Sequence, residues 1–316
     1  MQKNYNQNPI YGYFGKLPVF NDFIKYNAGN NEILVLDKWL QEGIILARQK
    51  LKSDWKPVYK NSFPLKFFFP FTGTNKLVSG VIFPSNDKSG RDFPFIMFCI
   101  YGNYIVDDVP FYLIPLQFNN EFNSFELIFN EVNANTSLES LNEQINRVSS
   151  PFTEETFVEK YRTFIGGLTQ EDFWEKIFDF NEEKKYCLIN NLFHPDIKNS
   201  SVALRFDFFS KSGDNVFDIC FLLNMLALSK KDFFLPAIFW TKDTENNNSL
   251  YIFPLKPNPL NYLDIISSAE NSDRIFKVEE VNPNEDSSIK DLLHNKEMKL
   301  KELLQILNTN LKFGEL

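Results

Sequence analysis

The chain has few of the side chains on which most enzyme chemistry depends. Only two of its 316 residues are histidines, His194 and His294. A Ser-His-Asp or Cys-His site would have to use His194, and no nucleophile-elbow motif accompanies it. Because His194 directly precedes a proline, we interpret it as a residue that caps or is solvated at a helix C-terminus. We therefore expect no catalytic residue and no enzyme activity.

Cysteine is also scarce. Cys99, Cys187 and Cys220 are odd in number, widely spaced and mostly set in apolar runs. Disulfide frameworks and zinc sites draw on Cys and His at short spacings, which this sequence lacks. We expect three reduced core thiols in a cytoplasmic protein, with no metal and no cofactor.

Long hydrophobic runs are absent as well. The most apolar stretch, FDICFLLNMLAL, is interrupted by Asp218 and Asn224, and the start of the chain has no signal-like segment. The sequence therefore predicts no transmembrane segment. The formal net charge of −8 opposes binding to nucleic acid, whose phosphates attract clustered Lys and Arg. It favours a basic or membrane-surface partner.

Strand-like and helix-like patterns alternate at both ends of the chain. Apolar runs predict strands over 10–14, 65–69, 76–83, 93–101, 201–209, 235–241 and 250–254. Apolar spacings of three and four predict helices over 33–51, 120–131, 137–148, 154–165, 170–190 and 215–228, with Asn30 or Asn31, Ser137 and Thr153 as N-caps. This order predicts an α/β fold, a three-layer α/β/α sandwich with a mixed sheet and a helical middle segment.

A change of composition marks the end of this unit. We expect one α/β unit over 1–268, made of a motif-bearing part (1–118), a helical segment (119–195) and a second α/β part (196–268). Asn, Asp, Glu and Ser dominate 269–288, which predicts a linker. An amphipathic helix is predicted over 289–316, and we expect its leucines to pack on the chain's own domain in preference to a partner.

Two motifs flank the first long helix. The first reads YFGKLPVFNDF (13–23), and the second reads SGVIFPSNDKSGRDFPF (79–95). Between them lie LDKWLQEGIILARQKL (36–51), Trp55 and Tyr59. This ordered set resembles the TagF family, also called ImpM, an accessory protein of bacterial type VI secretion. Asn21 replaces the expected glycine and Asn86 a common valine, and both changes affect loop geometry only.

The resemblance implies a function in regulation. TagF proteins are cytoplasmic post-translational regulators, generally repressors, associated with a forkhead-associated-domain scaffold of the secretion system. The family also implies the sandwich fold. Two alternatives remain open: a nucleotide- or phosphate-binding switch or enzyme that uses Arg91 and Lys16, and a structural subunit of the apparatus.

The motif residues suggest specific roles. Gly15-Lys16 does not fit a phosphate-binding loop, because Ile10 and Leu17 occupy positions that need glycine and Ser or Thr. We read it as a strand ending in a glycine turn with a solvated lysine. Arg91 could clamp a ligand, or could pin its loop to Asp87 or Asp22. In either case we expect Arg91 to lie near residues 15–23.

The candidate interaction residues from this reasoning are Gly15, Lys16, Pro18, Asp22, Asp87, Gly90 and Arg91. Trp174 is added as an exposed anchor for a partner, because it falls beside the inward stripe of its helix. We assign structural roles to Trp39, Trp55, Pro94 and Trp240.

Overall fold

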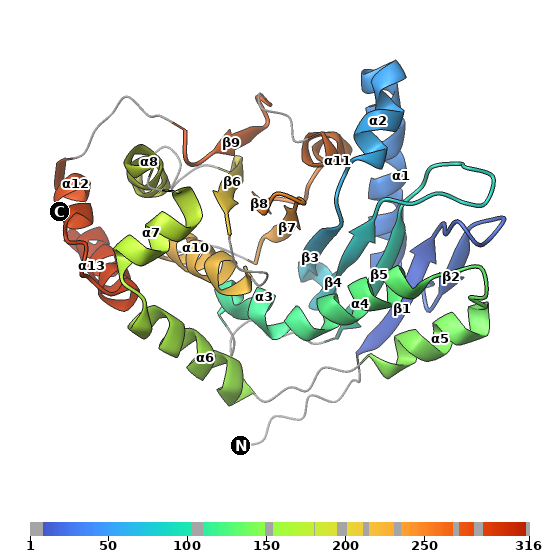
Figure 1. Cartoon of the computed structure of the whole chain (residues 1–316), viewed down its shortest axis with the longest axis horizontal. Coiled ribbons are helices and arrows are strands. Elements are labelled where there is room, and N and C mark those ends of the chain that lie inside the picture. Colours follow the sequence, from blue (N-terminus) through green and yellow to red (C-terminus); the bar gives the residue numbers. More distant parts are fainter. Residues whose placement is uncertain are drawn as a thin grey trace.

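A mixed β-sheet runs through the protein, with helices on both of its faces (Figure 1). The computed structural model describes residues 9–102, 110–148, 154–179, 181–194, 201–210, 215–230, 235–267, 272–280 and 287–313. Within them the sheet has nine strands in the order β2-β1-β5-β4-β3-β7-β8-β6-β9. All neighbouring strands are antiparallel except β6 and β9, which are parallel.

The strands are β1 (Ile10–Gly15), β2 (Ile24–Tyr26), β3 (Leu65–Phe71), β4 (Lys76–Phe83), β5 (Phe95–Tyr101), β6 (Ala203–Phe209), β7 (Ala237–Lys242), β8 (Asn247–Phe253) and β9 (Ile275–Lys277). The helices are α1 (Asn31–Leu51), α2 (Trp55–Lys60), α3 (Ile114–Gln117), α4 (Asn119–Glu131), α5 (Leu138–Arg147), α6 (Glu154–Gly167), α7 (Gln170–Phe178), α8 (Glu182–Phe193), α10 (Val216–Ser229), α11 (Pro259–Ile266), α12 (Ser287–His294) and α13 (Leu300–Phe313). Short 3₁₀ turns cover Lys52–Asp54, Thr72–Thr74 and Phe111–Leu113.

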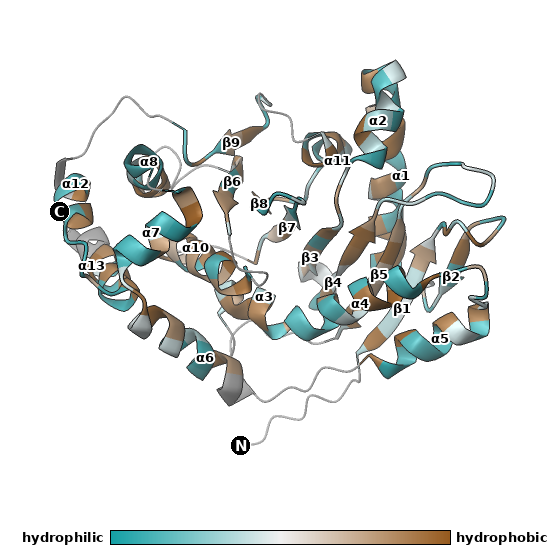
Figure 2. Cartoon of the chain, in the orientation of Figure 1, coloured by the Kyte–Doolittle hydropathy of each residue, from teal (hydrophilic) through white to brown (hydrophobic). Residues whose placement is uncertain are grey.

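Two apolar layers hold the sheet between its helices. Successive residues of a strand point to opposite faces, and β3 shows this clearly. Phe67 and Phe69 pack with α1, α2 and α11, whereas Phe68 packs on the other face with α4, α7, α8 and α10. Figure 2 shows β4 and β5 largely in brown, while α5 on the outside is largely teal. The predicted α/β sandwich with a mixed sheet is confirmed.

The expected strands and helices are present, with some differences at their ends. Helix α1 begins after Asn30, which lies at the N-cap position without a side-chain capping bond. Ser137 does cap α5, in a capping box closed by Ser140. The helix expected over 170–190 is wrong as a single element. It is two helices, α7 and α8, because Asp179 adopts a left-handed φ of 48° that ends the first. Thr153 lies outside the described residues.

The C-terminal part differs more. The expected linker contains strand β9, which pairs with β6, and Val278 after it is fully buried. The expected single C-terminal helix is two, α12 and α13, separated by a turn at which Lys299 forms a β-bridge with Thr169. Leu300 and Leu303 are buried in the main core. The leucines of α13 therefore pack on the chain's own domain, as expected.

In the part of the chain that the structure describes, no helix combines the length and the hydropathy needed to cross a membrane. All three cysteines lie in that part, and all three are buried thiols outside any disulfide.

Candidate functional site

The two motif segments meet at one end of the sheet. Gly15 at the end of β1 lies opposite Phe95 at the start of β5. Phe95 in turn lies opposite Phe83 at the end of β4. The loops that leave these strands, residues 15–23 and 84–94, are therefore side by side, and we call them together the motif site.

Glycine is required at the start of this site. Gly15 has a φ of 126°, and a Cβ atom placed on it would lie 2.1 Å from the carbonyl oxygen of Pro94. No other residue fits this close approach of two backbones. Pro94 is buried, which agrees with the structural role that the sequence suggested.

The Asp87 carboxylate is the centre of the motif site. It is fully buried. Its Oδ1 accepts hydrogen bonds from the backbone N–H groups of Ser89 and Arg91, both at 3.0 Å. Its Oδ2 accepts one from Arg91 Nε at 2.7 Å and lies 3.0 Å from Lys16 Nζ. Burial alone would raise the pKa of Asp87, but the hydrogen bonds from Arg91 and Lys16 outweigh it and hold the pKa well below its usual range.

Lys16 is not the solvated lysine that the sequence suggested. Its side chain is only 15% exposed and is paired with Asp87. The residue that invited a phosphate-loop interpretation therefore neutralises a buried carboxylate, which is a structural task.

Arg91 links the two loops, as expected. Its Nη2 donates a hydrogen bond of 3.0 Å to the carbonyl oxygen of Asn21 and lies 3.8 Å from the Asp22 carboxylate. The Asp22 side chain is 85% exposed, and its Oδ1 also accepts the backbone N–H of Phe23. Asn21 contributes a backbone oxygen and does not adopt a positive φ, so the glycine expected there is not required. Pro18 lies exposed on the same loop.

Backbone N–H groups of the 84–94 loop are bonded within the motif site. Lys88 donates to the carbonyl oxygen of Phe20 at 2.9 Å. Gly90, with a φ of 77°, donates to the carbonyl oxygen of Asp87 at 2.8 Å. Ser89 and Arg91 donate to the Asp87 carboxylate. These four successive donors are therefore not available to cradle a phosphate group.

Helices α1 and α2 hold the other side of the loop. The indole Nε1 of Trp55 donates to the Asp92 carboxylate at 3.3 Å, and Arg48 Nη2 donates to the Asp92 carbonyl oxygen at 2.8 Å. The Arg48 guanidinium also lies over the Trp55 ring, 5.2 Å from its centroid. Sequence reasoning included Trp55 but missed Arg48, because one arginine on a helix carries no signal of its own.

Tyr59 completes this side. Its hydroxyl donates to the Ser85 carbonyl oxygen at 2.9 Å and accepts the Ser85 backbone N–H at 3.1 Å. Arg48 of α1, Trp55 and Tyr59 thus hold the 84–94 loop in place. Ser85 was not singled out from the sequence, since its contribution comes from its backbone.

An aromatic ring lies at the edge of the motif site. Phe23 is 37% exposed, and its ring centroid is 5.5 Å from that of Phe93 and 6.3 Å from that of Phe14. It was not predicted as a site residue, because a single exposed phenylalanine is common on protein surfaces.

The prediction for Trp174 is wrong. Its side chain is 3% exposed and packs against Phe173, Phe178 and Phe221 in the core. Helix α7 is covered on more than one side by its neighbours, so a position beside the inward stripe is buried too.

The other two tryptophans lie in the core. Trp39 stacks on Phe239 and donates from Nε1 to the Asn258 carbonyl oxygen, and Trp240 packs against Phe68. His194 follows α8 at its C-cap.

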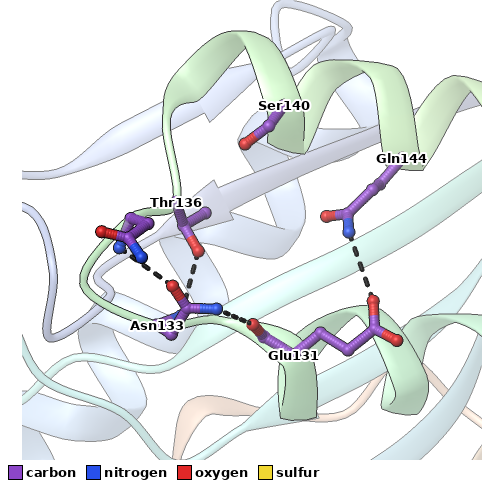
Figure 3. A pocket seen from close by; sticks show the side chains of 6 residues that line it. Glu131, Asn133, Thr136, Ser140 and Gln144 are labelled. Atoms are coloured by element: carbon purple, nitrogen blue, oxygen red, sulfur yellow. Dashed lines mark hydrogen bonds between the residues drawn. The ribbon is translucent and has the colours of Figure 1, made fainter.

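A shallow depression of about 540 Å³ lies between α4 and α5 (Figure 3). It is lined by Glu131, Asn133, Asn135, Thr136, Ser140 and Gln144. Its polar groups bond to one another: Gln144 donates to Glu131, and the Asn133 backbone N–H donates to Thr136. Helix capping and a tight turn account for these residues, so the depression is not a built ligand site.

Within the described ranges, no group of three or more His, Cys, Asp or Glu side chains could hold a metal ion. The buried Asp87 carboxylate of the motif site is instead paired with Lys16 and Arg91.

Comparison with known proteins agrees with the motifs. A family model described as the TagF N-terminal domain, type VI secretion system-associated, matches residues 12–148. No curated protein matches the chain. A solved structure, the crystal structure of PA0076 from Pseudomonas aeruginosa PAO1, is similar with a TM-score of 0.51 and 14% identity, over 88% of this chain and all of that one. At that identity the likeness concerns the fold alone. Residues 12–148, which include the whole motif site, therefore match the TagF N-terminal domain, which is described as type VI secretion system-associated.

Proposed function

We propose that this protein is a non-enzymatic cytoplasmic regulator that represses type VI secretion after translation, by binding a forkhead-associated-domain scaffold through the motif site. The proposal builds on the TagF N-terminal domain at residues 12–148 and on the roles that the family resemblance implies. The partner and the direction of regulation come from that resemblance.

One observation carries the choice of binding over catalysis. The only buried carboxylate of the motif site, Asp87, accepts four donors from the protein itself. A general base must be able to take a proton near neutral pH, whereas these contacts lower the pKa of Asp87. The contacts of Asp87 make the two loops of the motif site rigid. Rigid loops at the end of a sheet are common binding surfaces.

The experiment is a secretion assay in the source bacterium. Deleting the gene should raise secretion of a type VI effector, and re-expression of the wild-type chain should lower it again. A tagged chain should retain the forkhead-associated-domain scaffold from the same cells. Unchanged secretion after deletion would contradict the proposed role.

Thermal unfolding with a panel of nucleotides and inorganic phosphate tests the alternative of a nucleotide- or phosphate-dependent switch. A ligand that binds only the native state raises Tm. We expect no change, and a clear rise of Tm with any member of the panel would favour the switch. Co-purification with assembled secretion apparatus, without an effect on secretion, would favour a structural subunit.

A further inference from the structure

The outer rim of the motif site presents a cation and an aromatic ring. Arg91 and Phe93 are two residues apart on one loop, and Asp22 and Phe23 are adjacent on the other. The Arg91 side chain is 58% exposed, and Phe23 is 37% exposed. The ring contact between Phe23 and Phe93 joins the two loops at this rim.

The Arg91 side chain is fixed by hydrogen bonds, but part of its guanidinium remains available to a partner. Its Nε is bound by Asp87 and its Nη2 by the Asn21 carbonyl oxygen. Among the described residues, no hydrogen bond or ion pair involves Nη1. The pair with Asp22 is long, at 3.8 Å, and both side chains are largely exposed. Exposed pairs of this kind contribute little stability, so a partner can displace Asp22 at small cost.

The rim suits a carboxylate better than a phosphate. A phosphate site normally combines backbone N–H groups with more than one cation. Here the N–H groups of residues 88–91 are bonded within the protein, and Lys16 is enclosed with Asp87. A single planar guanidinium edge matches one carboxylate in a paired, two-bond contact.

We propose that the rim formed by Arg91, Phe23 and Phe93 binds an acidic segment of a partner protein, with a carboxylate on Arg91 and a neighbouring apolar side chain on Phe23. This inference rests on the proposed function, since it names the chemistry of the partner at the same surface. The net charge of −8 favours a basic partner for the chain as a whole. The fixed guanidinium therefore selects an acidic segment by local orientation, and not by long-range attraction.

The test uses three fluorescent peptides of equal length, in which leucine alternates with Glu, with phosphothreonine or with Lys. Binding to the full chain is followed by fluorescence anisotropy at low salt. We expect the Glu peptide to bind most tightly. Arg91→Gln should weaken its binding about tenfold, the usual effect of losing a charge-assisted hydrogen bond.

One further variant and two controls distinguish the proposed contact from nonspecific effects on binding. Phe23→Ala should also weaken the Glu peptide severalfold, whereas Leu255→Ala, an exposed apolar change outside the motif site, should not. Arg162→Gln removes an arginine of similar exposure (68%) from α6, which is distant from the motif site in Figure 1, and this variant should bind the peptide as the wild type does. Each variant is used after its Tm is shown to match that of the wild type.

Four outcomes overturn the proposal: tighter binding of the phosphothreonine peptide, tighter binding of the Lys peptide, no binding of any peptide, or equal losses in Arg91→Gln and Arg162→Gln. The outcome of the secretion assay does not depend on these peptide results. If the deletion leaves secretion unchanged while the Glu peptide binds as expected, the proposed function is wrong and the surface chemistry stands.

Discussion

Glu279 provides a quantitative test of the packing at the far edge of the sheet. It follows β9 and is 8% exposed. Its Oε1 accepts the backbone N–H of Asp207 at 3.2 Å, and its Oε2 is buried without a hydrogen-bond partner among the described residues. Burial, followed by the negative charge of Asp207, raises the pKa of Glu279 to about 7, although Lys184 on α8 opposes the shift.

This pKa determines how stability should change with pH. A carboxyl group whose pKa is higher in the folded state binds its proton more tightly there. Its contribution to stability is therefore complete below pH 4.5, the ordinary value, and is lost as the pH rises to about 7. The rise of the pKa corresponds to about 3 kcal/mol of unfolding free energy lost by pH 8.

Glu279→Gln removes this titration and keeps an acceptor for the Asp207 N–H. The new amide brings N–H donors of its own, and any cost of leaving them unpaired does not depend on pH. Relative to the wild type, the unfolding free energy of the variant should therefore increase by about 2–3 kcal/mol between pH 5 and pH 8. Urea denaturation at both pH values measures the difference.

Glu280→Gln is the matched control. Glu280 is 60% exposed and pairs with Lys277 at the surface, so its substitution should change stability by less than about 1 kcal/mol at either pH. Parallel stability curves for Glu279→Gln and the wild type from pH 5 to pH 8 would refute the assignment of a buried, titrating Glu279.

Three more predictions concern the supports of the fold. Gly15→Ala should lower Tm by several degrees, because its Cβ would clash with the Pro94 carbonyl oxygen. In the control Gly73→Ala the new Cβ meets no atom within 4 Å, so Tm should stay the same, and equal Tm values for the two variants would contradict the prediction. Asp87→Asn should lower Tm and speed hydrogen exchange of loop 84–94, and unchanged exchange would show that the buried charge is not needed. Removing residues 287–316 should expose core leucines and increase binding of a hydrophobic dye; a truncated chain that melts like the wild type would argue against docking of α12 and α13.

Local patterns were enough to predict the layers of the fold. Runs such as LKFFF are strands because alternate residues can be buried on both faces of a covered sheet. Strand β9 could not be predicted in this way. It has three residues in a polar segment, and it exists because it pairs with β6 about seventy residues away.

Contacts between helices were the second feature that the sequence could not predict. The spacing of apolar residues identifies one buried stripe of a helix. It does not show that Phe221 of α10 contacts Trp174 as well as Phe173 of the stripe, which is why Trp174 was misassigned. In the same way, the break between α12 and α13 depends on a bridge from Lys299 to Thr169, a contact that no local pattern contains.

The motif site was predicted in part. The spacing of Asp87 and Arg91 indicated a loop pinned by an ion pair, and the paired motifs indicated that Arg91 lies near residues 15–23. The partner of Lys16 could not be read from the sequence, since the burial of Asp87 follows from the meeting of three strand ends. The backbone contributions of Phe20, Asn21 and Ser85 likewise depend only on the folded geometry.

The most direct test of the account is the affinity of the purified chain for the forkhead-associated-domain scaffold of the same bacterium, measured by titration calorimetry. Arg91→Glu should weaken binding at least tenfold, because it places a negative charge where an acidic segment is expected. Arg162→Glu makes the same change of charge at an arginine of similar exposure on α6, and this variant should bind like the wild type. Equal affinity for the two variants, or no binding by the wild-type chain, would contradict the account.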